Sequence, residues 1–237
     1  MQHSSQVISV IVRPLSYVCL SVITVISVLS YSSITVKAQE QLPHKLACEE
    51  VLNNQRQKWQ AKPVQKLAQF TDSVQERSQL IQQANDLYSR RDFQNAQVSL
   101  CELVKKYPKD AFAHFQLGNV LFRRKQPEAA ISAYREAIRF NSKYALAYNA
   151  IGMVYASQNR WTDAISEYEK ALKINSNYGD AMMNFGQALW QVNKKDEAKS
   201  ALEKALNIFK SQSRNEKVYQ VEQILQQIKT LDNPSVS

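Results

Sequence analysis

Residues 145–178 read ALAYNAIGMVYASQNRWTDAISEYEKALKINSNY, and two helical patterns follow one another within them. In its first half, the residues at i, i+3, i+4 and i+7 form one stripe of an α-helix: Tyr148, Ile151, Gly152 and Tyr155. In its second half, the residues at i, i+4, i+7 and i+8 form another stripe: Ala164, Tyr168, Ala171 and Leu172. Asn159 lies between the stripes, and asparagine tolerates the left-handed backbone conformation that ends a helix. The stretch therefore predicts two antiparallel helices joined by a tight turn.

The same pattern recurs every 34 residues. Small residues keep this interval in three columns: Ala96, Ala130, Ala164 and Ala198; Ala137, Ala171 and Ala205; Gly118, Gly152 and Gly186. A fixed period of roughly 20 to 50 residues indicates a solenoid, in which one helical unit is copied and stacked. A glycine inside a helix costs ~1 kcal/mol relative to alanine, so three glycines at one interval indicate a steric requirement. We expect Gly152 and Ala164 to let the two helices of a hairpin approach closely.

This pattern resembles the tetratricopeptide repeat. The second and third copies match that family's pattern best, through His114, Leu117, Gly118, Leu121, Ala130, Tyr134 and Ala137, and then through Tyr148, Ile151, Gly152, Tyr155, Ala164, Tyr168 and Ala171. The first copy is looser, with Ala84 in the glycine position, and Ser142 and Ser176 replace the closing proline of later copies. The resemblance implies four copies without gaps, at 77–110, 111–144, 145–178 and 179–212. It implies an all-α fold, a right-handed α-solenoid of helix hairpins.

The N-terminal residues 1–38 have the features of a signal peptide. Val18–Leu29 is an apolar run of 12 residues, which suits the core of a signal peptide and is short for a membrane span. Small residues at Val36 and Ala38 predict cleavage before Gln39. The alternative is an uncleaved membrane anchor, because the stretch 14–36 carries no charge.

The repeats are flanked by two segments that lack the 34-residue pattern. Residues 39–76 are rich in glutamine and predict a helical cap, since the terminal units of a solenoid must cover an exposed apolar face. The alternative is a segment that lies in the groove and regulates access to it. Residues 213–237 predict a C-terminal capping helix and tail, with one apolar face made of Val218, Val221, Ile224, Leu225 and Ile228.

Two cysteines remain after cleavage, Cys48 and Cys101. In an oxidising compartment they could form a disulfide that ties the N-terminal segment to the first repeat. Such a loop of about 50 residues would add ~4 kcal/mol of stability in the chain-entropy model. The alternative is that both pack as free thiols on apolar helix faces.

The composition argues against catalysis, metal binding and nucleic-acid binding. The chain after residue 38 has two histidines, His44 and His114, which look too isolated to complete a zinc site with the cysteines. With four glycines, three of them inside repeat helices, no phosphate-binding loop is expected, and no cofactor is expected. Cleavage lowers the net charge from +9 to +7, and the basic residues lie mostly at helix ends, where they suit the helix dipole. We therefore predict a protein that is not an enzyme and does not bind nucleic acid.

The family resemblance also implies where a partner would bind. In tetratricopeptide proteins the first helix of each hairpin lines the concave groove. The corresponding positions here are Ile81, Asn85, Tyr88, Phe112, Phe115, Asn119, Phe122, Arg123, Leu146, Asn149, Met153, Met183, Gln187, Trp190 and Gln191. Three phenylalanines and a tryptophan on a solvated face indicate an interaction site for an apolar or aromatic peptide. The alternative is that Phe112 and Phe122 pack on neighbouring helices or beneath residues 39–76.

These observations lead to two hypotheses of function. The first is an exported adaptor, in the periplasm or an equivalent lumen, that binds partner proteins or peptides in its concave groove. The second is a structural or assembly scaffold, anchored in the membrane through residues 14–36, whose groove is covered by residues 39–76. An accessory factor of an enzyme, without activity of its own, would have the same sequence features as the first.

Overall fold

The structure is a computed structural model that describes residues 43–45, 47–52 and 72–232. All of these residues belong to one compact unit, Leu42–Ser237. The other unit, Met1–Gln41, lies outside the described residues, and so do the predicted signal peptide, its alternative as an anchor, and most of the predicted N-terminal cap. Within the described ranges, none of the helices combines the length and the apolar character that a membrane span requires.

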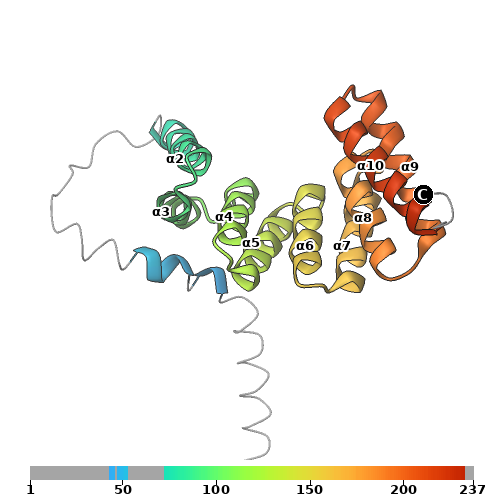
Figure 1. The fold of residues 1–237 in the computed structure, drawn as a ribbon. Coiled ribbons are helices and arrows are strands. Elements are labelled where there is room, and N and C mark those ends of the chain that lie inside the picture. Colours follow the sequence, from blue (N-terminus) through green and yellow to red (C-terminus); the bar gives the residue numbers. More distant parts are fainter. Residues whose placement is uncertain (1–42, 46, 53–71, 233–237) are drawn as a thin grey trace, which may run out of the picture. The chain divides into compact units, whose positions relative to one another are not determined.

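The described residues fold into helical hairpins that follow one another along the chain (Figure 1). The helices are α2 (Asp72–Ser89), α3 (Phe93–Lys106), α4 (Ala111–Arg123), α5 (Pro127–Phe140), α6 (Ala145–Ser157), α7 (Trp161–Ile174), α8 (Gly179–Gln191), α9 (Lys195–Ser211) and α10 (Asn215–Asp232). Residues 43–45 and 47–52 are also helical, and we call them the N-terminal segment. This architecture confirms the predicted all-α solenoid, with a helical segment before the hairpins and a further helix, α10, after them.

Residues in the left-handed conformation end the first helix of each hairpin. Asn159 and Asn193 have φ angles of 59° and 62°, as the sequence predicted. Arg91 and Lys125 occupy the same position in the first two hairpins, with φ angles of 61° and 58°. After α6, the amide of Arg160 donates to the carbonyl of Tyr155 at 2.9 Å, which satisfies a carbonyl that the helix end leaves unpaired.

The glycines of the repeated column, Gly118, Gly152 and Gly186, make room for a large side chain of the paired helix. A Cβ atom placed on Gly152 would lie 2.5 Å from Cε1 of Tyr168, and one on Gly118 would lie 2.5 Å from the ring of Tyr134. In the last hairpin, a Cβ on Gly186 would lie 2.8 Å from Leu202. Ala164 is fully buried, so the close contact between the helices that the sequence predicted is present, with an aromatic ring at its centre.

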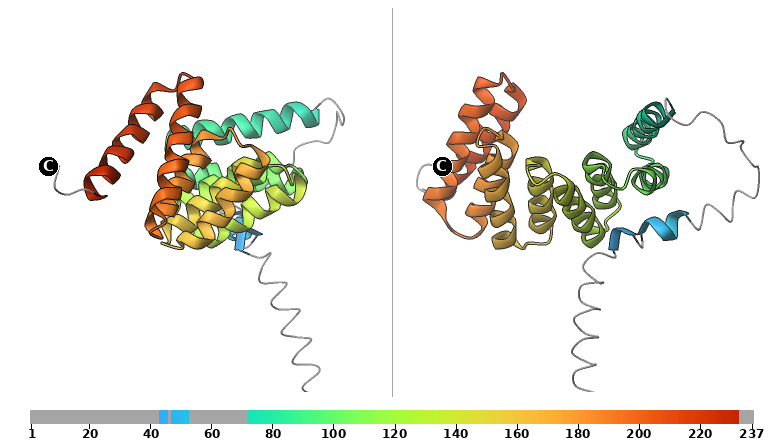
Figure 2. Two further views of the ribbon diagram at one scale, coloured as in Figure 1. Left: turned by 90° about the vertical axis from the view of Figure 1, so that its right-hand side faces the viewer. Right: turned by 180° about the vertical axis from the view of Figure 1, so that it is seen from behind.

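Helix α10 covers the last hairpin. Val221 and Ile228 of α10 are buried with Phe209 of α9 and Met183 of α8 in one apolar cluster. Arg214, at the turn before α10, forms an ion pair with Asp180 of α8, with 2.7 Å between Nη1 and Oδ2. These contacts are those of a capping helix. In Figure 2, α10 lies beside α9 at the end of the unit that carries the C-terminus.

Candidate functional site

The first helices of successive hairpins lie side by side and share one face. Helix α4 contacts α6, and α6 contacts α8. Amide side chains bridge these helices: Gln116 of α4 donates to Asn85 of α2 at 3.0 Å, and Asn184 of α8 donates to Asn149 of α6 at 3.1 Å. We call this surface the A-helix face. It is the face on which the sequence placed the groove.

Part of the predicted groove set is accessible on this face. Tyr88 and Phe112 each expose 37% of their surface, and Met153 exposes 43%. Asn85 and Arg123 are exposed as well. Exposed apolar side chains that share one face with amide groups are typical of an interaction surface.

The other aromatic members of the set are held within the packing. The Phe115 ring lies 5.7 Å from the Tyr134 ring and 5.1 Å from the Tyr144 ring, and Phe122 packs against the core. Ile81 is half-buried against the same core. Trp190 is also half-buried, and Nζ of Lys195 lies 5.4 Å from the centre of its ring. The predicted row of exposed phenylalanines is therefore reduced to Phe112.

Two predicted groove residues are buried, which corrects their assignment. Met183 is 4% exposed because it packs in the cluster that α10 closes. Asn149 is 5% exposed, and its amide donates to the Tyr178 hydroxyl at 3.3 Å while its Oδ1 accepts from Asn184. Gln187, by contrast, is half-exposed. Neither Met183 nor Asn149 can meet a partner without rearrangement of α8 or α10.

Asn119 lies at the centre of the accessible part. Its Oδ1 accepts from the Tyr134 hydroxyl at 2.9 Å, and its Nδ2 donates to Gln116 at 2.9 Å. Gln116 in turn donates to Asn85, so the three amides form a ladder from α4 to α2. Beside this ladder is a small depression of about 90 Å³, lined also by Tyr88.

The structure adds residues that the sequence analysis did not select. Phe93, at the start of α3, contacts Tyr88 with ring centres 5.3 Å apart, and the Arg123 guanidinium lies 5.5 Å from the Phe93 ring. Gln116 and Asn184 also join the face through the hydrogen bonds above. All three lie outside the positions carried over from the family pattern, so that pattern gave no signal for them.

The N-terminal segment lies on a different surface. Cys48 and Cys101 are joined by a disulfide, which ties the segment to α3. Gln97 of α3 donates to the carbonyl of Ala47 at 2.9 Å, and His44 Nδ1 lies 2.9 Å from Ser132 Oγ of α5. The segment therefore bridges the second helices of the first two hairpins.

Its effect is visible in the exposure of one repeated serine. Ser132 is buried under the segment, whereas Ser166, which has the same position one hairpin later, is exposed. The comparison shows that the segment itself removes this part of α5 from solvent.

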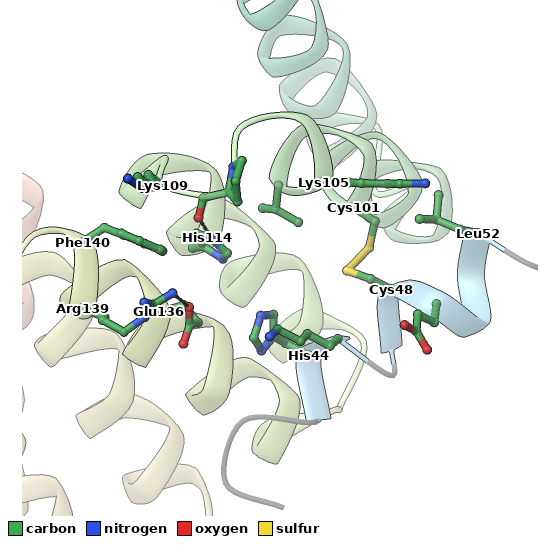
Figure 3. A pocket seen from close by; sticks show the side chains of 14 residues that line it. His44, Cys48, Leu52, Cys101, Lys105, Lys109, His114, Glu136, Arg139 and Phe140 are labelled. Atoms are coloured by element: carbon green, nitrogen blue, oxygen red, sulfur yellow. Dashed lines mark hydrogen bonds and ion pairs between the residues drawn. A yellow bond between two sulfur atoms is a disulfide. The ribbon is translucent and has the colours of Figure 1, made fainter. Parts of the chain in front are cut away.

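A pocket of about 730 Å³ lies where the N-terminal segment meets α3, α4 and α5 (Figure 3). His44 and Cys48 enter it from the segment, His114 from α4, and Glu136 and Phe140 from α5. The two histidines, which look isolated in the sequence, are brought together with their ring centres 5.8 Å apart.

Both imidazoles are held in the neutral form. Burial, with a smaller contribution from the neighbouring His114, lowers the pKa of His44 to about 4. Burial also lowers the pKa of His114. The hydrogen bond to the Pro108 carbonyl raises that pKa, but burial has the larger effect. That carbonyl can only accept, so Nε2 of His114 carries the proton at 2.9 Å from it, and Nδ1 is a buried acceptor without a hydrogen bond.

Among the described residues no group of three or more histidine, cysteine, aspartate and glutamate side chains could hold a metal ion. The two cysteines are engaged with each other, so neither supplies a thiolate. Glu136 is paired with Arg139 at 2.6 Å.

Comparisons with known proteins agree with the architecture. A family model described as a tetratricopeptide repeat matches residues 143–211, and one described as a TPR repeat matches residues 118–159. None of the curated protein sequences matches the chain.

Three solved structures are similar in fold. A crystal structure of MamA is 28% identical with a TM-score of 0.54, and covers 60% of this chain and 84% of its own. A crystal structure named for the MamA protein is 29% identical with a TM-score of 0.52, and covers 58% of this chain and 75% of its own. A structure of pilF from Pseudomonas aeruginosa is 22% identical with a TM-score of 0.53, covers 65% of this chain and 77% of its own, and supports the fold alone. The chain thus contains tetratricopeptide repeats, which generally build protein-interaction scaffolds and not enzymes.

Proposed function

We propose that this protein is an exported scaffold that binds an apolar or aromatic segment of a partner protein on its A-helix face. The observation that carries the proposal is the pairing of exposed apolar side chains with amides on one face. Tyr88, Phe112 and Met153 are exposed there, around the ladder that Asn85 forms with α4. Amides of this kind can bond to a peptide backbone while apolar side chains provide most of the affinity.

The spacing of the anchors suits a short extended peptide. Phe112 lies at the start of α4 and Arg123 at its end, which puts them ~16 Å apart along the helix axis at 1.5 Å per residue. An extended peptide covers that distance with about five residues at ~3.3 Å each. Tyr88, Phe93 and Arg123 would hold one end of such a peptide, and Phe112 the other.

Export is supported by two features of the N-terminal half. The apolar run Val18–Leu29 has the length of a signal-peptide core, followed by small residues where cleavage would occur. The disulfide between Cys48 and Cys101 is of the kind that persists in oxidising compartments. A periplasm or an equivalent lumen satisfies both.

The binding surface is tested with variants at exposed positions, which do not disturb the core. Partner capture from the native source is compared for wild type, Tyr88→Ser, Phe112→Ser and the double variant. Tyr219 on α10 is 65% exposed and outside the A-helix face, so Tyr219→Ser is the matched control. We expect the same partner with wild type and control, and its loss with the double variant. Equal recovery by all five proteins would move the binding site elsewhere.

The anchored scaffold remains the alternative function, and cell fractionation with N-terminal sequencing separates the two. A mature chain that begins at Gln39 in the soluble fraction supports export. A full-length chain in the membrane fraction supports the anchor through residues 14–36 and contradicts the cleavage.

A further inference from the structure

The pocket beneath the N-terminal segment is independent of the A-helix face. Its walls come from the segment, α3, α4 and α5, and the disulfide between Cys48 and Cys101 fixes the segment side to the α3 side. A volume of about 730 Å³ lies within the roughly 300 to 1,000 Å³ of small-molecule sites. The pocket is therefore large enough for a small ligand, and the N-terminal segment and α3 form two of its walls.

The lining between the walls is apolar. It consists of Leu52 of the segment, Val104 of α3, Pro108 between α3 and α4, and Phe140 of α5, together with the disulfide. Phe140 is held in place because its ring stacks on the His114 ring, with the ring centres 5.5 Å apart, and the Arg139 guanidinium lies 4.1 Å from the centre of the Phe140 ring. Such a surface favours the apolar body of a ligand.

The charges at the pocket are unbalanced. Lys45, Lys105 and Lys109 line it and are exposed, with no hydrogen bond or ion pair to another described residue. Figure 3 shows Lys105 and Lys109 on opposite sides of the pocket. Two acidic residues line the pocket. Glu136 forms an ion pair with Arg139, whereas Glu49, like the lysines, has no ion pair with another described residue.

The histidines do not alter this balance. His44 and His114 are neutral near pH 7, because burial lowers the pKa of both rings. The disulfide also removes the thiolate charge that free cysteines could contribute. Cations thus outnumber anions around an apolar cavity.

We propose that this pocket binds a small amphipathic carboxylate, with its apolar part against Val104, Leu52 and Phe140 and its carboxylate near Lys105 or Lys109. The apolar walls select against fully polar anions, and the excess of lysines selects against cations. The site needs no partner on the A-helix face, so it would be present whether or not the proposed function is correct.

The test compares three probes with a ten-carbon chain: decanoate, decanol and decyltrimethylammonium. Binding to the oxidised protein is measured by titration, with amide NMR shifts at Val104 and Phe140 to locate it. We expect saturable binding of decanoate at these residues below about 1 mM, with decanol weaker and decyltrimethylammonium weakest.

Lysine variants test the role of charge. Lys105→Gln and Lys109→Gln should each weaken decanoate by about 2- to 5-fold, as expected for one exposed charge pair, and leave decanol unchanged. Lys173 has the position of Lys105 two hairpins later, at the penultimate residue of α7, and is exposed. Lys173→Gln is therefore the matched control and should bind decanoate as wild type does.

Several results would overturn the assignment. These are the absence of saturable decanoate binding, equal affinity for decanoate and decyltrimethylammonium, or an equal loss with Lys173→Gln. Binding at Val104 and Phe140 of a short peptide of alternating glutamate and leucine, with no binding of decanoate, would assign the pocket to a protein segment and also overturn it.

Discussion

Replacing Gly152 with alanine tests the steric argument for the fold. The new Cβ would lie 2.5 Å from Cε1 and 2.7 Å from Cδ1 of Tyr168, well inside the ordinary contact range of 3.4–4 Å. Tyr168 is 2% exposed, so its ring cannot turn into solvent. The hairpin must either open or displace the ring.

The size of the effect follows from two opposed contributions. Overpacking a buried site costs about 1–3 kcal/mol, and glycine to alanine in a helix gains ~1 kcal/mol. We expect a net loss of up to ~2 kcal/mol, which lowers Tm by up to about 8 °C for a chain of this size. Thermal and urea unfolding followed by circular dichroism measure it. Ser166→Ala, at an exposed position of α7, should leave Tm nearly unchanged.

A second substitution makes the test specific. The first hairpin carries Ala84 and Leu100 at the positions of Gly152 and Tyr168, and both are 2% exposed. In a Tyr168→Leu background, Gly152→Ala should therefore be neutral or stabilising, with a coupling energy of about 1–3 kcal/mol in the double-mutant cycle. If Gly152→Ala lowers the free energy of unfolding equally in both backgrounds, or raises it in the wild type, the steric explanation of the glycine column is wrong.

Two further predictions concern the N-terminal segment. Removing the disulfide with Cys48→Ala and Cys101→Ala should lower the free energy of unfolding by ~4 kcal/mol, given its separation of 53 residues. Mass measurement of the native protein with and without reduction should show no free thiol at Cys48 or Cys101 before reduction, and free thiols at both positions would contradict the disulfide. The pKa of His44 is lowered from 6.5 to about 4, so the unfolded chain takes up a proton first as the pH falls. The free energy of unfolding should then drop by up to ~3 kcal/mol between pH 6.5 and pH 4, and His44→Asn should lose that part of the pH dependence; an unchanged pH profile in the variant would contradict it.

The packing columns were predictable because they depend on contacts that repeat. Ala96, Ala130, Ala164 and Ala198 are all fully buried, as the 34-residue interval indicates. Each alanine meets the same neighbours within its own hairpin, so the pattern of one copy determines the environment in all. The turn residues follow the same logic, although arginine and lysine take the left-handed position in two hairpins where asparagine takes it in the others.

Exposure on the A-helix face was less predictable, because it depends on what covers each copy. Met183 occupies the same repeat position as Phe115, yet α10 buries the first and the rings of Tyr134 and Tyr144 half-bury the second. A position in a repeat gives the direction of a side chain and not the neighbour that meets it. The family pattern therefore overestimated the aromatic surface that the A-helix face exposes, and whether a partner binds on that face stays a prediction.

The pocket could not be predicted from the sequence. Its contacts join residues far apart in the chain, such as His44 with Ser132 and Ala47 with Gln97, and none of them recurs at the 34-residue interval. The sequence carries a signal for one pair alone, Cys48 and Cys101, because cysteines in an exported chain are candidates for pairing. That pair offered a disulfide to α3 as one of two alternatives, and it gave no indication of the cavity that forms with α5.

The position of the N-terminal segment bears on two interpretations that the sequence left open for residues 39–76, a cap of the repeats and a cover of the groove. A segment over the groove would block partner binding, whereas the described residues of the segment contact Gln97 and Cys101 of α3 and Ser132 of α5, which are second helices of their hairpins. Tyr88 and Phe112 lie on first helices, and both are exposed. Any cover of the A-helix face would therefore have to come from residues outside 43–45 and 47–52. Because the segment contacts both α3 and α5, it bridges the second helices of the first two hairpins, whose first helices carry Tyr88 and Phe112.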